Sequence, residues 1–171
     1  MLDFTTFVDR FMSGAQAAGL REALSIVAQA PSPVAPAASP TQARAPVPHE
    51  LVTYHDSCQS HNCLGLKAQG RRVLREALGV EVTELTDSAV CCGFGGSFSV
   101  DFPEVSGRVL RRKLANVEAT GADTVITDNP GCIFHLRGGL HAAGRETRVL
   151  HLAEYLAEAL AQGAWPYSSG A

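Results

Sequence analysis

Four cysteines follow successive apolar segments of the chain, and they are the residues best suited to carry chemistry. Cys58 follows the first segment, Cys91 and Cys92 follow the second, and Cys132 follows the third. Thiolates are the ligands of structural zinc and of iron–sulfur clusters. The chain has five cysteines in all and no paired CxxC motif, so a metal site would have to be assembled from distant parts of the chain.

Glycines stand beside these thiols. Gly93, Gly95 and Gly96 follow the Cys91-Cys92 pair, and they allow positive φ and a close approach of the backbone to an inorganic group. Successive N–H groups that face thiolates or sulfides offset negative charge. We therefore include these three glycines in the predicted cofactor site. The turn 129–131 should present Cys132 at a helix N-terminus, which favours its thiolate form.

The surrounding pattern alternates between strands and helices. Period-two or short apolar segments predict strands at 51–55, 80–85, 124–127 and 148–151. Helical spacing predicts helices at 71–78 and 103–120, then one from about 133 to 143 and one from 152 to 160. This order predicts an α/β fold, a small four-stranded mostly parallel sheet with helices on both faces. Loops after parallel strands meet at one edge, so the four cysteines should converge there.

The helix predicted over 103–120 has two expected faces. Val105, Val109, Leu114 and Val117 should form its buried stripe. The opposite face should carry a basic cluster of Arg108, Arg111, Arg112 and Lys113. A solvated face is the first interpretation of that cluster, and a docking patch for an acidic partner is the second.

Composition divides the chain into four parts. Residues 1–29 predict a separate N-terminal helix, with Phe4, Phe7 and Val8 at helical spacing. Residues 30–48 are rich in Pro and Ala and predict an extended linker. Residues 49–163 form the cysteine-rich domain, and 164–171 form a short tail.

Overall composition excludes several classes of protein. The chain has 171 residues, 46% hydrophobic content and a formal net charge of −3. Such a chain can bury an apolar core. It lacks the excess of Lys and Arg over Asp and Glu that nucleic-acid binding requires. It contains no run of 18 apolar residues, so no transmembrane segment is expected. The N-terminus does not have the pattern of a signal peptide, so we expect reduced thiols and a cytoplasmic location, including the membrane periphery where partners bind there.

Other interpretations of the cysteines remain open. They include buried inert thiols, tetrahedral zinc in place of an iron–sulfur cluster, and a vicinal disulfide between Cys91 and Cys92. Cys63 is expected to be a packed thiol rather than a ligand. His55 is either a neighbour that interacts with a thiolate or a strand-end residue with its hydrogen bonds satisfied.

Three separated motifs resemble one known family. HDSC at 55–58, CCGFGGSF at 91–98 and NPGC at 129–132 are similar to the cysteine-rich CCG domain. That domain occurs in the cysteine-rich component of heterodisulfide reductase, in the iron–sulfur component of glycolate oxidase and in lactate-utilisation protein A. The resemblance extends over about residues 49–160. Relatives usually carry two such domains, so the chain resembles the C-terminal half of one of them.

The resemblance implies a function. Cys58, Cys91, Cys92 and Cys132 would bind an iron–sulfur cluster, [4Fe–4S] in type, with zinc as the alternative. The family motif ends in CxxC, and Asn129 occupies the first of these two positions, which leaves four cysteine ligands.

The chain would then be an electron-transfer component of a complex that oxidises a 2-hydroxy acid, lactate or glycolate. It would have no catalytic residue of its own and would not be active alone. Its partners would be a second CCG or ferredoxin-like protein and a flavin dehydrogenase. The alternatives are a zinc-stapled assembly module and a thiol/disulfide reductase component of the heterodisulfide reductase type.

Overall fold

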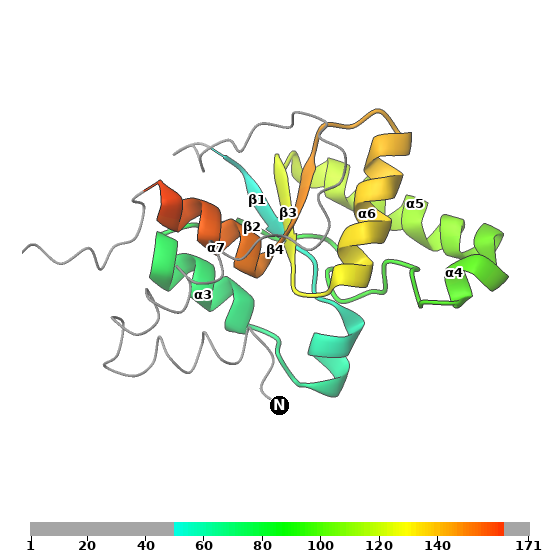
Figure 1. Ribbon diagram of the computed structural model, residues 1–171, viewed down its shortest axis with the longest axis horizontal. Coiled ribbons are helices and arrows are strands. Elements are labelled where there is room, and N and C mark those ends of the chain that lie inside the picture. The colour runs from blue at the N-terminus through cyan, green and yellow to red at the C-terminus, as the bar shows by residue number, and fades with distance from the viewer. Residues whose placement is uncertain (1–49, 163–171) are drawn as a thin grey trace, which may run out of the picture.

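The computed structural model describes residues 50–162, which Figure 1 draws as the coloured ribbon. The predicted N-terminal helix over 1–29, the linker over 30–48 and the tail over 164–171 lie outside the described residues. Their boundaries therefore stay predictions.

Four short parallel strands form one sheet in the middle of the described part (Figure 1). They are β1 (Val52–Tyr54), β2 (Val82–Thr83), β3 (Thr124–Thr127) and β4 (Arg148–His151), in the order β2-β1-β3-β4. Each pair of neighbours is parallel, so the predicted α/β architecture is confirmed. The strands β1 and β3 are buried along their whole length, as expected for a parallel sheet covered on both faces.

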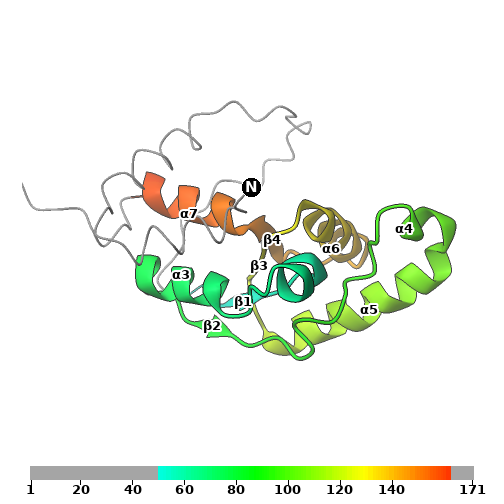
Figure 2. The same ribbon diagram turned by 90° about the horizontal axis from the view of Figure 1, so that it is seen from below.

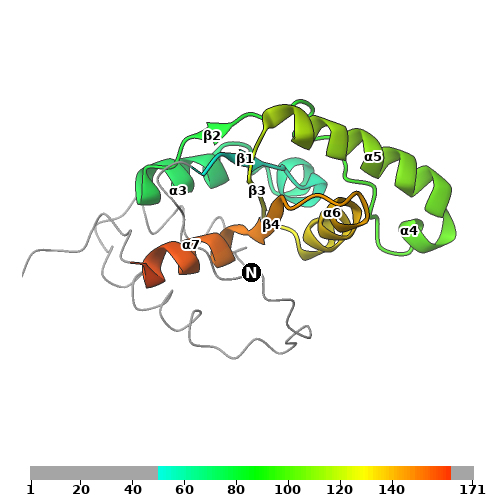
Figure 3. The same ribbon diagram turned by 90° about the horizontal axis from the view of Figure 1, so that it is seen from above.

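Two helices cover one face of the sheet. They are α3 (Gln69–Leu78) and α7 (Leu152–Ala161), and Figures 2 and 3 show both on the same side of the strands. Alternate strand residues point toward them, because successive side chains of a strand face opposite ways. The buried residues of this layer are Val52, Tyr54, Val73, Leu74, Ala77, Ile126, Leu150, Leu152, Tyr155 and Leu156.

The other face is covered by α5 (Pro103–Thr120) and α6 (Pro130–Ala142), on the opposite side of the strands in Figures 2 and 3. Leu114 and Val117 of α5 and Leu136 of α6 pack with Val125 of the sheet. Two cysteines belong to this same cluster of buried side chains, Cys92 and Cys132. The apolar core thus continues directly into the site.

Two expectations for α5 are wrong. Val105 is 50% exposed, whereas Lys113 is buried with only 2% of its surface exposed. The N-terminal turns of α5 pack on the short helix α4 (Phe98–Asp101) and lie away from the strands, so Val105 has no sheet to cover (Figure 1). Lys113 faces the domain because its ammonium group binds backbone carbonyls of the loop after β2.

Two short elements were not predicted. They are α4 and a single π-helical turn, η1 (Gln59–Cys63), which follows β1. Segments of four or five residues are too short to show a periodic apolar pattern. Among the helices of residues 50–162, none is both long enough and apolar enough to span a bilayer.

Candidate metal centre

The loop after β1 forms one wall of the site. The His55 N–H donates to the Ile126 carbonyl (2.8 Å) and so continues the sheet by one residue. The Arg71 guanidinium binds both oxygens of the Asp56 carboxylate at 2.8 and 3.0 Å. Burial opposes ionisation of Asp56, but this guanidinium outweighs it and lowers the pKa of the carboxyl group. Cys58 directly precedes η1 as its N-terminal cap residue and is exposed at the surface.

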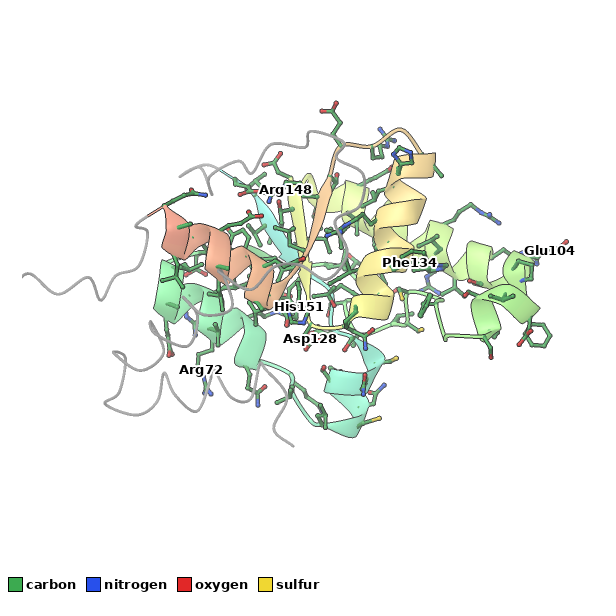
Figure 4. All side chains as sticks on the ribbon, viewed as in Figure 1. Arg72, Glu104, Asp128, Phe134, Arg148 and His151 are labelled. Atoms are coloured by element: carbon green, nitrogen blue, oxygen red, sulfur yellow. The ribbon has the colours of Figure 1, made fainter. Side chains whose placement is uncertain are left out.

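The loops after β1 and β3 are bound to each other. The Ser57 hydroxyl donates to Asp128 (2.7 Å), and the Asn129 amide donates to Gln59 (2.9 Å). Figure 4 shows Asp128 beside His151, where β3 and β4 end, and the His151 Nε2 donates to the Asp128 carbonyl (3.2 Å). These contacts keep the C-terminal ends of three strands together.

Asn129 positions Cys132 instead of serving as a ligand. Its side-chain oxygen accepts the N–H groups of Gly131 (2.9 Å) and Cys132 (3.2 Å), which caps α6. Its side-chain amide is already bound to the loop after β1. The residue that stands in place of a family cysteine thus acts as a helix cap.

The CCG loop needs its first glycine for space and for backbone conformation. Gly93 has a φ of 95°, and a Cβ there would lie 2.8 Å from the Ser106 carbonyl oxygen. The Ser106 hydroxyl donates to the Gly93 carbonyl (2.8 Å), which fixes the loop on α5. The Gly93 N–H donates to the Cys91 sulfur (3.3 Å), one of the backbone contacts predicted for this loop.

The other two predicted glycines act differently. Gly95 and Gly96 also have positive φ, 54° and 63°. Their carbonyls accept the N–H groups of Phe98 and Ser99 and so begin the turn into α4. Phe94 precedes these two glycines in the sequence. Its ring packs on the backbone of Gly131, where a Cβ would lie 2.7 Å from the ring. The loop therefore contacts the turn that presents Cys132.

The four predicted cysteines come together at the C-terminal edge of the sheet. The Cys92 and Cys132 sulfurs are 3.4 Å apart and buried. Cys58 and Cys91 form an exposed outer pair, close enough to each other and to Cys132 to interact electrostatically. All five cysteines of the chain are free thiols, so the vicinal disulfide is not formed. Cys63 ends η1 at the surface, so the expected packing of this thiol is wrong.

The inner pair shares one proton. The pKa of Cys92 falls to about 4, chiefly because the Cys132 thiol binds its thiolate, against the effect of burial, and interactions with the His55 ring and the Phe94 backbone add to the lowering. The pKa of Cys132 is raised in turn by the neighbouring Cys92 sulfur and by burial. The expectation that the start of α6 would favour the Cys132 thiolate is wrong for the metal-free chain, because the adjacent thiolate opposes a second negative charge.

Two polar side chains lie behind the thiols: His55, for which the sequence left two interpretations open, and Lys113, which the sequence placed on a solvated face. His55 is fully buried, and its Nδ1–H donates to the Ser88 carbonyl (3.0 Å). The Lys113 ammonium approaches the same carbonyl (3.4 Å) and also binds the carbonyl of Asp87. Lys113 attracts the charges of Cys91 and Cys92, so a cation stands close to the cysteine cluster.

These donors fit a thiophilic metal. Cys92, Cys132 and His55 place their ligand atoms within 4.8 Å of one another, in buried surroundings. The His55 Nε2 is buried and has no hydrogen-bond partner within the described part of the chain. Thiolate ligands select zinc and iron–sulfur clusters over hard cations. The only signal for His55 in the sequence was a polar residue directly after a buried strand.

Comparison with known proteins agrees with this geometry. The family described as CCG, a cysteine-rich domain, matches residues 52–137. Lactate utilization protein A of Lysinibacillus sphaericus is 38% identical over 104 residues, which cover 61% of this chain and 46% of that protein. The protein of the same name from Bacillus velezensis is 37% identical over 108 residues, 63% of this chain and 45% of that protein.

Lactate utilization protein A 2 of Bacillus cereus is 34% identical over 113 residues, 66% of this chain and 47% of that protein. The chain thus spans about half the length of the curated relatives it matches. The matched segment contains the four converging cysteines and the CCG loop. The chain belongs to the family of CCG cysteine-rich domains.

Proposed function

We propose that this domain holds an iron–sulfur cluster and carries electrons in the oxidation of a 2-hydroxy acid. One observation carries the proposal: four thiols from three different loops meet at one edge of the sheet. Cys58, Cys91, Cys92 and Cys132 supply the four thiolates that a [4Fe–4S] cluster needs. The glycines of the CCG loop let its backbone follow the cluster closely.

The environment of the thiols suits electron transfer. Cys92 and Cys132 lie in the apolar core, whereas Cys58 and Cys91 are exposed. A cluster bound between these pairs would have one side toward solvent or a partner. The Lys113 ammonium offsets part of the negative charge of a thiolate-bound cluster, which raises its reduction potential.

Lactate is the substrate we propose, with glycolate as the related possibility, because the relatives are named for lactate utilization. The substrate would react at a flavin of a partner protein, and this domain would receive the electrons. A second CCG or ferredoxin-like protein would complete the complex, in the cytoplasm or at its membrane surface.

A partner surface is available beside the thiols. Phe134 on α6 is 74% exposed, and its ring meets that of Phe94 in the CCG loop at 6.2 Å between centroids. Figure 4 shows Phe134 on the side of α6 that faces away from the strands. An open hollow of about 1060 Å³ along α6 also includes Leu110 and Ile133 in its mostly apolar lining. Exposed apolar side chains of this kind are typical of protein interfaces.

Anaerobic reconstitution of the full chain tests the proposal. Iron and sulfide should be incorporated in near-equal amounts, and the protein should become brown with broad visible absorption. A colourless protein that takes up no sulfide and retains zinc through the same treatment would contradict it, since Zn²⁺ is d¹⁰.

A structural zinc site is the second candidate, and one distance favours it. Two thiolates on one tetrahedral zinc ion lie about 3.8 Å apart, given Zn–S bonds of about 2.3 Å. The Cys92 and Cys132 sulfurs are separated by 3.4 Å, close to this value. In this case the domain would be an assembly module that carries no electrons itself, and removal of the metal would unfold it.

A further inference from the structure

We propose that the His55 Nε2 is a direct ligand of the metal centre, so that the centre has a mixed thiolate and imidazole ligand set. This inference rests on the proposed function only in that a metal is bound; it applies to iron–sulfur and to zinc alike. It adds a nitrogen donor to the four cysteines.

Burial is the first argument. His55 has no exposed surface, and its Nε2 has no hydrogen-bond partner of ordinary geometry among the described residues, although the ring interacts with the Cys92 sulfur. An unsatisfied polar atom in an apolar interior is costly, so native proteins rarely keep one without a partner. The sulfurs of Cys92 and Cys132 lie within 4.8 Å of a ring nitrogen of His55. A metal bound by these sulfurs would satisfy it.

The tautomer is the second argument. A carbonyl oxygen only accepts hydrogen bonds, so the His55 Nδ1 that faces Ser88 must carry a proton. With Nδ1 directed at the Ser88 carbonyl, Nε2 is the ring nitrogen left to bind a metal on the side of the thiols. This is the arrangement of histidine ligands, which donate their other ring N–H to a backbone carbonyl.

The Ser88 carbonyl is itself held in place. It also accepts the backbone N–H of Asp56 (3.2 Å), and the Arg71 guanidinium holds the side chain of that residue. The imidazole thus has a fixed orientation before metal binds, which lowers the entropic cost of using it as a ligand. A neutral imidazole donor adds no negative charge to the centre, whereas a further thiolate would, so the potential of the centre is higher than that of an all-thiolate one.

Isotope labelling of the unaltered protein gives the first test. The full chain is prepared with ¹⁴N- or ¹⁵N-histidine, reconstituted anaerobically with iron and sulfide, reduced, and examined by pulsed electron paramagnetic resonance. We expect a strong nitrogen coupling that changes with the label. A cluster that assembles without such a coupling would overturn the inference and leave the proposed function standing.

Cobalt gives the second test, which does not require a cluster. Co²⁺ should bind the unaltered chain with d–d bands of a mixed sulfur and nitrogen site. In His55→Asn, which keeps a donor for the Ser88 carbonyl but lacks Nε2, the bands should shift and the Kd for Co²⁺ should rise at least about tenfold. His135→Asn is the matched control, since His135 contacts the Phe94 ring and the Ser106 hydroxyl.

The two tests separate the two ideas. If no iron–sulfur cluster assembles but His55→Asn changes the Co²⁺ spectrum, the proposed function fails and the inference stands. If no cluster assembles and His55→Asn binds Co²⁺ with unchanged bands and unchanged Kd, the inference is wrong. Circular dichroism checks that His55→Asn is folded. If a cluster forms, the nitrogen coupling in the histidine-labelled protein decides whether His55 is a ligand.

Discussion

Among single side chains, Cys92 has the most demanding environment of the site. It is buried, its sulfur is 3.4 Å from that of Cys132, and it belongs to the core cluster on the α5 and α6 face. Cys63 is its natural comparison, since it is a free thiol at the surface, five residues along the chain from Cys58.

We predict that Cys92→Ser loses most of the bound metal, whereas Cys63→Ser keeps it. A ligand thiolate contributes metal-binding free energy to folding, so the thermal midpoint of Cys92→Ser should also fall. The measurement is iron, zinc and sulfide per chain after anaerobic reconstitution, with melting followed by circular dichroism. Equal metal content in the two variants would show that Cys92 is not a ligand.

Lys113 is a buried cation with a structural role. Its ammonium binds the carbonyls of Asp87 and Ser88, and burial lowers its pKa. Lys113→Met keeps the aliphatic stem but leaves both carbonyls without this donor, so we predict a loss of about 1–3 kcal/mol in the free energy of unfolding.

The control is Arg112→Met. The side chain of Arg112 is 70% exposed and forms an ion pair with Asp87 at 2.6 Å. Exposed pairs of this kind contribute about 0–1 kcal/mol. Urea denaturation of both variants in the metal-free state measures the difference. If Lys113→Met is no less stable than Arg112→Met, the buried ammonium has no structural role.

Tyr155 sets a limit to stability at high pH. It is buried in the α3 and α7 layer, and burial raises its pKa to about 12. Between about pH 10 and 12 the unfolded chain loses the phenol proton and the folded chain keeps it. We predict that the free energy of unfolding falls across this window by about 2–3 kcal/mol more in the unaltered chain than in Tyr155→Phe. Urea titrations at pH 9 and 11.5 test this, and parallel pH dependence in both proteins would refute it.

Among the elements, the CCG loop is the most constrained. It leaves the sheet after β2, carries two thiols past the start of α5, and contacts the turn before α6. Its conformation depends on Gly93, which has both positive φ and no room for a Cβ. Gly96 has positive φ as well, but a Cβ there would meet nothing within 4 Å.

This contrast gives a matched pair of variants. Gly96→Ala should cost about 1 kcal/mol, from backbone strain alone. Gly93→Ala should cost about 2–4 kcal/mol, because overlap with the Ser106 carbonyl adds to the strain, and it should weaken metal binding by moving Cys92. Chemical denaturation and Co²⁺ titration measure both effects. Equal costs would mean that the loop relaxes freely around Gly93.

At the scale of the whole molecule, the described residues place a candidate metal site at the C-terminal edge of the sheet. The exposed aromatic and aliphatic side chains near the CCG loop include Val100, Phe102 and Phe134. The relatives are about twice as long as the matched segment. These facts support the proposal that the domain works within a larger assembly.

We predict that the purified chain alone does not oxidise lactate or glycolate at an enzymatic rate with an artificial acceptor. Oxidation should appear only when partner proteins are co-purified from the native cell under anaerobic conditions. Phe134→Asp should reduce that co-purification and leave the metal content unchanged, because Phe134 lies outside the ligand set. Turnover by the lone chain would contradict its role as one component of a complex.

The local pattern of the sequence was enough to predict the parallel α/β sheet and the edge at which the cysteines meet. Strands β1, β3 and β4 agree with their predicted positions to within a residue or two. Strand β2, at the edge of the sheet, is shorter than the predicted segment 80–85 and covers only Val82–Thr83. Period-two and helical patterns depend on neighbours close in sequence. The rule that loops after parallel strands share one edge then brings Cys58 near Cys92 without further information.

The tertiary structure was needed to place individual side chains. Lys113 turns inward because carbonyls from a loop about 25 residues away lie there, and Val105 is exposed because the first turns of α5 lie away from the sheet. The lone pair of His55 becomes a candidate ligand only once Ser88 accepts the other ring proton and the thiols of two further loops surround it. Such environments depend on contacts between residues far apart in sequence, and no periodic pattern records those contacts.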